Sequence, residues 1–340
     1  MEKSKVLIVY TGGTIGMVTD HTTGSLVAFD FDHLYDQVPE LNRLEIDIQA
    51  VSFEKPVDSS EMTPAMWRKL AQIIYDNYTD FDGFVVLHGS DTMSYTASAL
   101  SFMLQGLKKP VILTGSQLPI GTIRTDGKEN LITAIEIAGT QDQNGDPVVQ
   151  EVAVYFEYSL YRGNRTTKVS ASEFEAFKSG NYPELAVAGV HIRFNEQALF
   201  RTRLSEVQFH PDFREEIALL KLFPGLPFSA YAPLFDIKKV KGIILSTYGA
   251  GNGPADRRFI ELLDNYIQSG GIVLNITQCS SGAVEQGKYE TSRQFVQLGV
   301  VSGGELTTEA AIAKMMHVCA THLTREEKIE LLTTECCGEM

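Results

Sequence analysis

Continuous apolar runs recur along the chain, and segments of helical periodicity lie between several of them. Because these runs lack the alternation of a strand with one wet face, they predict a parallel sheet buried on both sides. The predicted strands cover residues 6–10, 84–87, 111–114, 152–156, 217–223, 242–245 and 272–276. The predicted helices cover residues 92–107, 131–139, 254–267, 308–318 and 325–332, with a further one that begins at Pro64. This order of strand then helix predicts an α/β fold whose sheet is doubly wound.

The periodic pattern fades between residues 195 and 215, and a second set of apolar runs follows. A chain of 340 residues is large for one domain and suits two. We therefore expect a larger N-terminal α/β domain at residues 1–194, which holds the candidate catalytic residues, and a linker at 195–215. A smaller C-terminal α/β domain is expected at residues 216–340.

The composition is that of a globular chain, with 44% hydrophobic and 21% charged residues. The net charge of -14 argues against a nucleic-acid partner bound through a basic surface. No apolar stretch approaches the ~18 residues that span a bilayer, and no signal-peptide pattern opens the chain, so no membrane partner is expected. Cys336 and Cys337 are adjacent, and the four cysteines do not form a disulfide framework, which indicates a reducing cytoplasm. No Cys/His spacing predicts a metal site.

Hydroxyl groups follow two of the predicted strands. Thr14 lies in Thr-Gly-Gly-Thr-Ile after the first strand, and Ser90 and Asp91 lie in His-Gly-Ser-Asp-Thr after the second. Ligands of open α/β sheets bind at the carboxyl ends of strands, where such groups would meet them. Thr14 is a candidate nucleophile if a base takes its proton, and the glycines before it expose N–H groups to an oxyanion. Each group also fits a helix cap or tight turn, and His88 fits either a base or a buried structural residue.

Other polar segments add candidates near these strand ends. Lys168 closes a basic run at residues 162–168 and would serve as a base if desolvation lowered its pKa, although most charge runs are solvated faces. Hydroxyl groups also occur in the loop 57–62 and after the strand that ends at Thr114, which favours a small polar ligand. The turn 249–254 lacks the full dinucleotide spacing, and P-loop and G-x-S-x-G motifs are missing, so no organic cofactor is expected.

Taken together, these segments resemble the L-asparaginases of the bacterial cytoplasmic kind (type I). The residues 11–15 are similar to one signature of the family, and 88–93 are similar to the other. The similarity continues through residues 96–104, 110–119, 161–168 and 248–252. The resemblance covers nearly the whole chain, and it rests on two long motifs with the lysine downstream.

This resemblance implies an amidohydrolase that converts L-asparagine and water to L-aspartate and ammonia, with weak activity on L-glutamine. Thr14 would attack the side-chain amide and form an acyl-enzyme, which water then hydrolyses. Ser90, Asp91 and Lys168 would form a second set that relays protons, either for the nucleophile or for the water. Asp91 would also hold the α-ammonium group of the substrate.

The resemblance also implies a substrate pocket without metal or organic cofactor. The residues that match it are Gly13, Ser59, Ser60, Ser116 and Asn252. Ser59 and Ser60 would hold the α-carboxylate, and Asn252 would come from a neighbouring subunit. A homodimer or homotetramer is therefore expected.

The sequence departs from the family pattern at a few positions. Ser90 stands where the family usually has threonine, which keeps the hydroxyl and loses a methyl. The polar segment 16–30 is expected to be a lid, and the family usually has a tyrosine near Ser25. No tyrosine occurs between Thr11 and Phe31, so no tyrosine role is assigned.

A regulatory asparagine site, which some members of the family have, is not expected. Thr277 and Cys279 lie in the matching segment, but Ser246 stands where an arginine would hold the effector's carboxylate.

Two other functions were weighed. The ammonia-producing subunit of a tRNA-dependent amidotransferase would have an N-terminal extension, whereas Thr11 lies near the start. A non-catalytic amino-acid sensor would be favoured by the loss of Thr14 or Lys168, and both are present.

Overall fold

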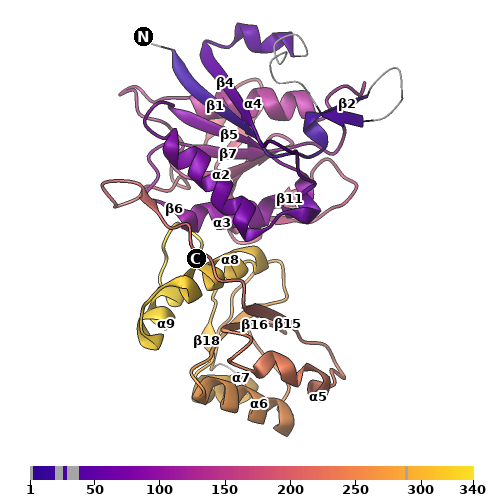
Figure 1. The fold of residues 1–340 in the computed structure, drawn as a ribbon, viewed down its shortest axis with the longest axis vertical. Helices are drawn as coiled ribbons and strands as arrows, with labels where there is room; N and C mark the ends of the chain where they lie inside the picture. The colour runs from indigo at the N-terminus through magenta and orange to yellow at the C-terminus, as the bar shows by residue number, and fades with distance from the viewer. Residues whose placement is uncertain (1–2, 20–25, 29–37, 288–289) are drawn as a thin grey trace. The chain divides into compact units, whose positions relative to one another are not determined.

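The computed structural model describes residues 3–19, 26–28, 38–287 and 290–340 (Figure 1). The chain divides into two compact units, an N-terminal unit at Met1–Pro211 and a C-terminal unit at Asp212–Met340. The division lies inside the segment where the sequence pattern fades, and the domain limits drawn from the sequence stay a prediction. Within the described part of the chain, no helix is both long and apolar enough to cross a membrane.

The N-terminal unit is built on an eight-stranded mixed sheet in the order β13-β12-β9-β8-β7-β5-β1-β4. Its parallel part contains β1 (Ser4–Tyr10), β4 (Ile46–Ser52), β5 (Gly83–Leu87), β7 (Val111–Thr114) and β8 (Val152–Phe156). The strands β9 (Ser159–Arg162), β12 (Ala186–Ala188) and β13 (Ile192–Phe194) continue it in antiparallel pairing. The α/β class is confirmed, and the predicted strands of this unit pair in parallel. A tight turn after β8 adds an antiparallel hairpin that the sequence pattern did not predict.

Helices cover both faces of this sheet (Figure 1). α4 (Gly127–Gly139) packs Leu131 and Ile135 against the apolar side chains of Ile8 and Ile112 on one face. α2 (Pro64–Asp76) and α3 (Met93–Met103) lie on the other. The helix predicted at 92–107 ends early, because β6 (Leu104–Gln105) pairs with β14 (Gln208–Phe209).

The strand order of the parallel part defines a topological switch point. Numbered along the chain, these strands run 2-1-3-4-5, so the order reverses between β1 and β5. In open α/β sheets, ligands bind beyond the carboxyl ends of the strands at such a switch point. The two polar strand ends singled out in the sequence therefore follow the two strands that flank it.

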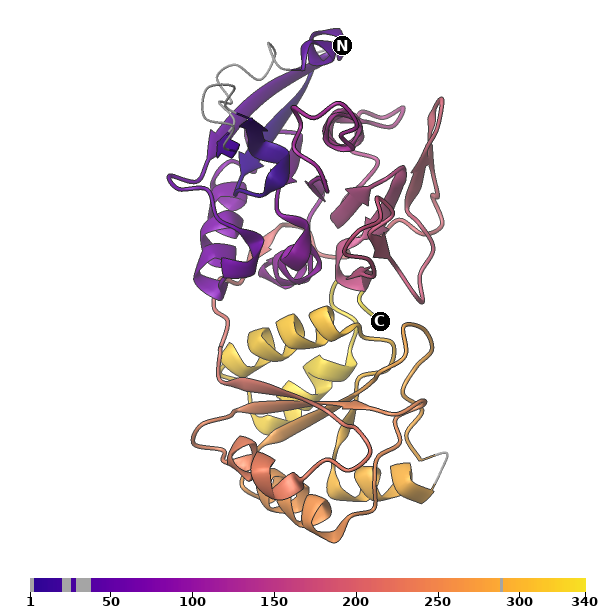
Figure 2. The same ribbon diagram turned by 90° about the vertical axis from the view of Figure 1, so that its right-hand side faces the viewer.

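The C-terminal unit is a smaller three-layer α/β structure. Its parallel sheet contains β15 (Ile217–Lys221), β16 (Gly242–Thr247), β17 (Ile272–Thr277) and β18 (Val301–Ser302). Figure 2 shows α8 (Thr308–Ala320) and α9 (Arg325–Thr333) on one face, with α6 (Arg257–Gln268) on the other. Two apolar clusters fill the layers, with α8 in one and α6 in the other. This unit also confirms the α/β class predicted from the sequence.

Several shorter elements complete the two units. They include the hairpin β2 (Met17–Thr19) and β3 (Leu26–Ala28), the pair β10 (Thr167–Lys168) and β11 (Phe177–Lys178), and the helices α5 (Phe228–Tyr231) and α7 (Glu290–Leu298). The 3-10 turns η1 (Thr14–Gly16), η3 (Pro39–Arg43), η4 (Ser59–Glu61), η5 (Ser90–Thr92), η6 (Gly163–Arg165) and η7 (Ala232–Phe235) join longer elements. Three of these turns, η1, η4 and η5, carry candidate site residues.

Candidate active site

Two glycines bring the end of β1 against two other segments. The φ angles of Gly12 (+139°) and Gly13 (+90°) lie in a region that favours glycine. A Cβ on Gly12 would lie 2.1 Å from the Val57 carbonyl oxygen, and one on Gly13 would lie 2.4 Å from the Gly89 nitrogen. Both the amide and the hydroxyl of Thr11 donate to the Leu87 carbonyl at 3.0 Å. The ends of β1 and β5 and the loop before α2 therefore touch through their backbones.

Thr14 opens the turn η1 directly after these glycines, and its side chain is half-buried. A side chain of β1 holds this turn in place, because the Tyr10 hydroxyl donates to the Gly16 carbonyl at 3.0 Å. Among the described residues, the Thr14 hydroxyl has no hydrogen-bond partner. The hydroxyl oxygen of a capping threonine would accept a hydrogen bond from a backbone N–H. Thr14 makes no such bond, so its hydroxyl is open to a ligand.

Lys168 joins Ser90 and Asp91 into one cluster at the end of β5. Its Nζ donates to Ser90 Oγ at 2.8 Å and to Asp91 Oδ1 at 2.7 Å. The Lys168 side chain is 16% exposed, whereas that of Asp91 is 67% exposed and open to a ligand. Neither Ser90 nor Asp91 caps α3, because its N-cap is Thr92 and no side chain bonds there.

Gln117 belongs to this cluster, although the sequence did not single it out. Ser90 Oγ donates to Gln117 Oε1 at 3.2 Å, and Gln117 Nε2 donates to the Glu173 carbonyl at 2.9 Å. The backbone of its loop is held by Asp126, which accepts from the amides of Gln117 and Leu118. A signal was available, since the loop follows β7, the next parallel strand beside β5.

His88 has a structural position rather than that of a base. Its Nδ1 lies 2.7 Å from the Gly89 carbonyl oxygen, which accepts only, so Nδ1 carries the proton. Nε2 then accepts from the Thr96 hydroxyl at 2.9 Å, and that oxygen accepts from Trp67 Nε1 at 2.9 Å. Complete burial lowers the pKa of His88 to about 4, so the ring is neutral at pH 7.

The two serines of the loop before α2 are placed differently. Ser59 is buried, and its Oγ lies 2.6 Å from where a Cβ of Gly89 would be. Its carbonyl accepts from Thr92 Oγ1 at 2.7 Å, which ties this loop to the end of β5. The amide and hydroxyl of Ser60 both donate to Asp58 Oδ1. These bonds hold the loop in shape and lower the pKa of Asp58.

The remaining candidates lie apart from this contact network or face away from it. The Ser116 hydroxyl is buried and donates to the Leu118 carbonyl at 2.6 Å, within its own loop. Asn252 belongs to the C-terminal unit, where its amide and carbonyl bond the backbone of Tyr248 in a tight turn. The expected lid at 16–30 and the position near Ser25 fall largely outside the described residues.

The segment weighed for a regulatory site contains no arginine at its key position. Ser246 is buried in β16, and Thr277 Oγ1 donates to the Gly249 carbonyl at 2.6 Å. Cys279 is exposed, and its amide donates to Thr277 Oγ1. The Thr277 hydroxyl and the Cys279 amide therefore form their hydrogen bonds within the turn itself. The expectation that the chain has no regulatory site stays a prediction.

The chemistry that these groups can perform is that of an oxygen nucleophile. An unbonded threonine hydroxyl, glycine amides beside it and a lysine–carboxylate–hydroxyl set follow the two strands that flank the switch point. Such parts suit nucleophilic attack on a carbonyl carbon. Among the described residues, no group of three or more His, Cys, Asp or Glu side chains could hold a metal ion.

Comparisons with known proteins show the family to which the chain belongs. The family profile "Asparaginase, N-terminal" matches residues 5–200, and "Glutaminase/Asparaginase C-terminal domain" matches residues 216–332. The chain is 38% identical over 341 residues to L-asparaginase 1 of Escherichia coli, covering 100% of this chain and 99% of that protein. It is 36% identical to the 60 kDa lysophospholipase of Mus musculus, covering 99% of this chain and 62% of that protein. The crystal structure of L-asparaginase I from Vibrio cholerae aligns with a TM-score of 0.89 at 36% identity, covering 99% of each chain. The chain therefore belongs to the asparaginase family.

Proposed function

We propose that the chain is an asparaginase, which hydrolyses L-asparagine to L-aspartate and ammonia. The observation that carries the proposal is the cluster at the end of β5, where one ammonium group contacts both Ser90 and Asp91. Across the switch point, the Gly13–Thr14 turn lies next to this cluster. The two are so close that a Cβ on Gly13 would clash with the backbone of Gly89. The family and the names of two similar proteins, both L-asparaginases, support the same reaction.

Thr14 is the proposed nucleophile. Its Oγ would attack the carbonyl carbon of the side-chain amide, and the N–H groups of the glycine turn would stabilise the oxyanion. The C–N bond then breaks, and ammonia leaves with the proton that the hydroxyl gave up. Water adds to the resulting ester, the C–O bond to Thr14 breaks, and aspartate is released with the hydroxyl restored.

The proton relay is assigned to Ser90, Asp91 and Lys168. In the observed arrangement the Lys168 ammonium donates to both partners, and the Ser90 hydroxyl donates a hydrogen bond to Gln117 Oε1. Asp91 balances the charge of the lysine, which keeps the set neutral overall when both are ionised. A Lys168→Met variant separates the two steps that this set can serve. If the set activates water, the ester on Thr14 accumulates and mass spectrometry detects it; if it activates Thr14, no ester forms.

The substrate's charged groups have matching partners. The Asp91 carboxylate is open enough to take the α-ammonium group as well as Lys168. We place the α-carboxylate at Ser59 and Ser60, with Gly13 and Ser116 completing the pocket and Asn252 added from a neighbouring subunit of a homo-oligomer. No metal or organic cofactor takes part in this scheme. The four cysteines are unpaired, which supports a cytoplasmic location.

The proposal is tested by ammonia release from Thr14→Ala. We expect turnover to fall by about 10³-fold or more, because no other group forms the ester, while asparagine still binds. Isothermal titration calorimetry measures that binding. Thr63→Ala is the matched control, since Thr63 is exposed and makes no capping bond with its side chain. Full turnover by Thr14→Ala would remove the assignment of the nucleophile.

The substrate range tests the reaction itself. We expect saturable release of ammonia from L-asparagine and a weaker reaction with L-glutamine. Turnover that depends on charged tRNA would instead favour the amidotransferase function. Binding of asparagine without turnover in the wild-type chain would favour a sensor. A sigmoidal dependence of rate on asparagine would restore the regulatory site.

A further inference from the structure

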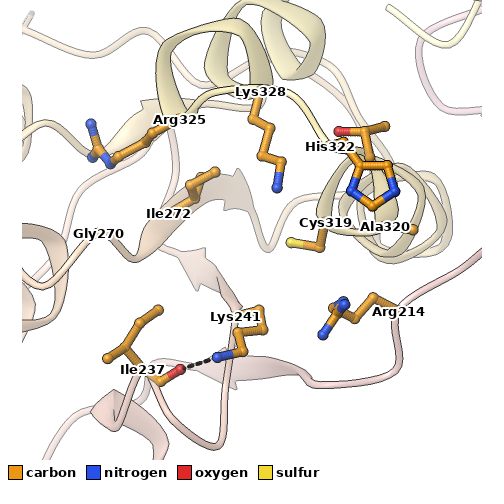
Figure 3. Close-up of a pocket in the computed structure, with 11 residues that line it drawn as sticks. Arg214, Ile237, Lys241, Gly270, Ile272, Cys319, Ala320, His322, Arg325 and Lys328 are labelled. Carbon is orange, nitrogen blue, oxygen red and sulfur yellow. Dashed lines mark hydrogen bonds between the residues drawn. The ribbon is translucent and has the colours of Figure 1, made fainter.

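A cavity lined by basic side chains lies in the C-terminal unit (Figure 3). Its volume is about 290 Å³, and it lies where β16 and β17 begin, at the opposite end of the sheet from the Tyr248–Asn252 turn. The chemically active residues of its lining are Arg214, Lys241, Cys319, His322, Arg325 and Lys328. These residues come from segments that lie far apart in the sequence, so they could not be recognised there as a group.

Positive charge dominates this cavity. Arg214, Lys241, Arg325 and Lys328 bring four cationic side chains, and no Asp or Glu is among the residues that line it. This is unusual in a chain with 43 acidic and 29 basic residues. The Cys319 thiol adds no negative charge, because burial raises its pKa to about 11.

The counter-charges nearest the cluster lie on exposed side chains, since the adjoining hollow that shares Arg214 and His322 also contains Asp212, Glu215 and Glu216. Arg214 lies 3.5 Å from Glu216, and both side chains are about half exposed, so this pair is weak. α8 ends at the cavity and contributes about half a negative charge through its dipole. Water and salt screen the exposed carboxylates, and no acid lines the cavity itself, so mutual repulsion among the four cationic side chains favours a bound anion there.

Donor groups in the cavity are available to such an anion. Figure 3 shows Lys328 and Arg214 extending toward the space beside Cys319. Within the part of the chain that the structure describes, the Lys328 ammonium has no hydrogen-bond or ion-pair partner. Arg325 makes one long bond, from Nη2 to the Gly271 carbonyl at 3.4 Å, and its Nε has none. Lys241 uses one of its three donors on the Ile237 carbonyl at 2.8 Å.

We propose that this cavity binds a small oxyanion with two or more negative charges, carried by phosphate or carboxylate groups. Arginine forks and lysine point charges suit both groups, and the volume suits a small molecule. The site is separate from the Thr14 and Lys168 groups of the N-terminal unit, so it does not depend on the proposed hydrolysis. Pyrophosphate represents one source of such anions and citrate the other.

The test is calorimetric titration of the full chain with pyrophosphate, inorganic phosphate and citrate, with ionic strength held constant by NaCl. We expect one saturable site per chain. Tighter binding of pyrophosphate than of citrate would identify the ligand as a phosphate compound, and the reverse would identify it as a carboxylate. Lys328→Met and Lys241→Met should each weaken binding by about tenfold or more, because each removes one charged donor. Lys238→Met is the matched control, since this exposed lysine does not line the cavity.

Three outcomes would overturn the proposal. One is heat no greater than that of an added NaCl blank for all three anions. Another is equal binding by the wild type and both cavity variants when circular dichroism shows that the variants are folded. Weakening by Lys238→Met to the same degree as Lys328→Met would also overturn it, because binding would then follow overall charge alone.

Discussion

Gln117 sets the direction of the proton on Ser90. Ser90 Oγ accepts from Lys168 Nζ, so its own hydrogen must point elsewhere, and Gln117 Oε1 receives it. A flip of the Gln117 side-chain amide would break a hydrogen bond, because its Nε2 donates to the Glu173 carbonyl. If Ser90 has the proposed relay role, Gln117 is a positioning residue that acts through it.

We predict that Gln117→Leu lowers kcat by about tenfold and leaves KM nearly unchanged, because one hydrogen bond worth ~1 kcal/mol is lost from the relay. Steady-state ammonia release measures both constants. Gln72→Leu is the control, since Gln72 bonds Asp76 on an exposed helix face. A rise in KM without a change in kcat would show that Gln117 contacts substrate instead.

The sequence predicted the residues at strand ends, but not how their side chains pair. Thr14, Ser90 and Asp91 follow apolar runs, and a strand end is visible in a sequence. The link from Ser90 to Gln117 is not visible, because it depends on how two loops fold beside neighbouring strands. The two interpretations left open for His88 were decided only by Thr96, eight residues further along.

Three elements meet at His88. The chain of bonds from Trp67 on α2 through Thr96 on α3 to His88 fixes the end of β5 against both helices. This chain works only with a neutral ring, since Nε2 must accept from the Thr96 hydroxyl. The stability of this contact therefore depends on pH.

We predict that acid destabilises the fold through this residue. The pKa of His88 is 6.5 in the unfolded chain and about 4 in the folded chain. Well above pH 6.5 the imidazole is neutral in both, so His88 gives the free energy of unfolding no pH dependence there. As the pH falls below 6.5, only the unfolded state takes up the proton, and stability is lost until the folded state is protonated near pH 4. Between pH 7 and pH 5 this loss is about 2 kcal/mol.

Urea unfolding of the wild type and His88→Asn at these two pH values measures the effect. The variant should be less stable at pH 7 because packing is lost, but its stability should fall about 2 kcal/mol less on going to pH 5. His191→Asn, at an exposed position, should behave like the wild type. Parallel losses in the wild type and His88→Asn would contradict the account.

Most of the strands that the sequence predicts are those whose side chains are buried on both faces. Strands such as β5 and β8 are buried throughout and appear as apolar runs. β4 was missed because it pairs on one side only, and most of its side chains are exposed. α7 was missed because its sequence is mostly polar, although Phe295 packs in the core. Short antiparallel strands such as β12 form only because a neighbour is already in place.

The residues proposed for the site belong to both units of the chain. Thr14, Ser90 and Lys168 belong to the N-terminal unit, whereas Asn252 lies in a turn of the C-terminal unit. The resemblance to the family implies that Asn252 is donated by a neighbouring subunit. If so, each site needs two chains, and a variant in one chain can be complemented by another.

We predict that Thr14→Ala and Asn252→Ala chains restore activity when they are mixed. Each variant alone should retain less than about a tenth of wild-type turnover. After equal amounts are dissociated and reassembled as dimers, half of the dimers contain one chain of each kind. Each such dimer has one site with both changes and one with neither, so about a quarter of wild-type turnover should return. If Asn252 served its own chain, every site would contain one change and no activity would return. Ammonia release before and after reassembly therefore decides whether the active site is shared between subunits.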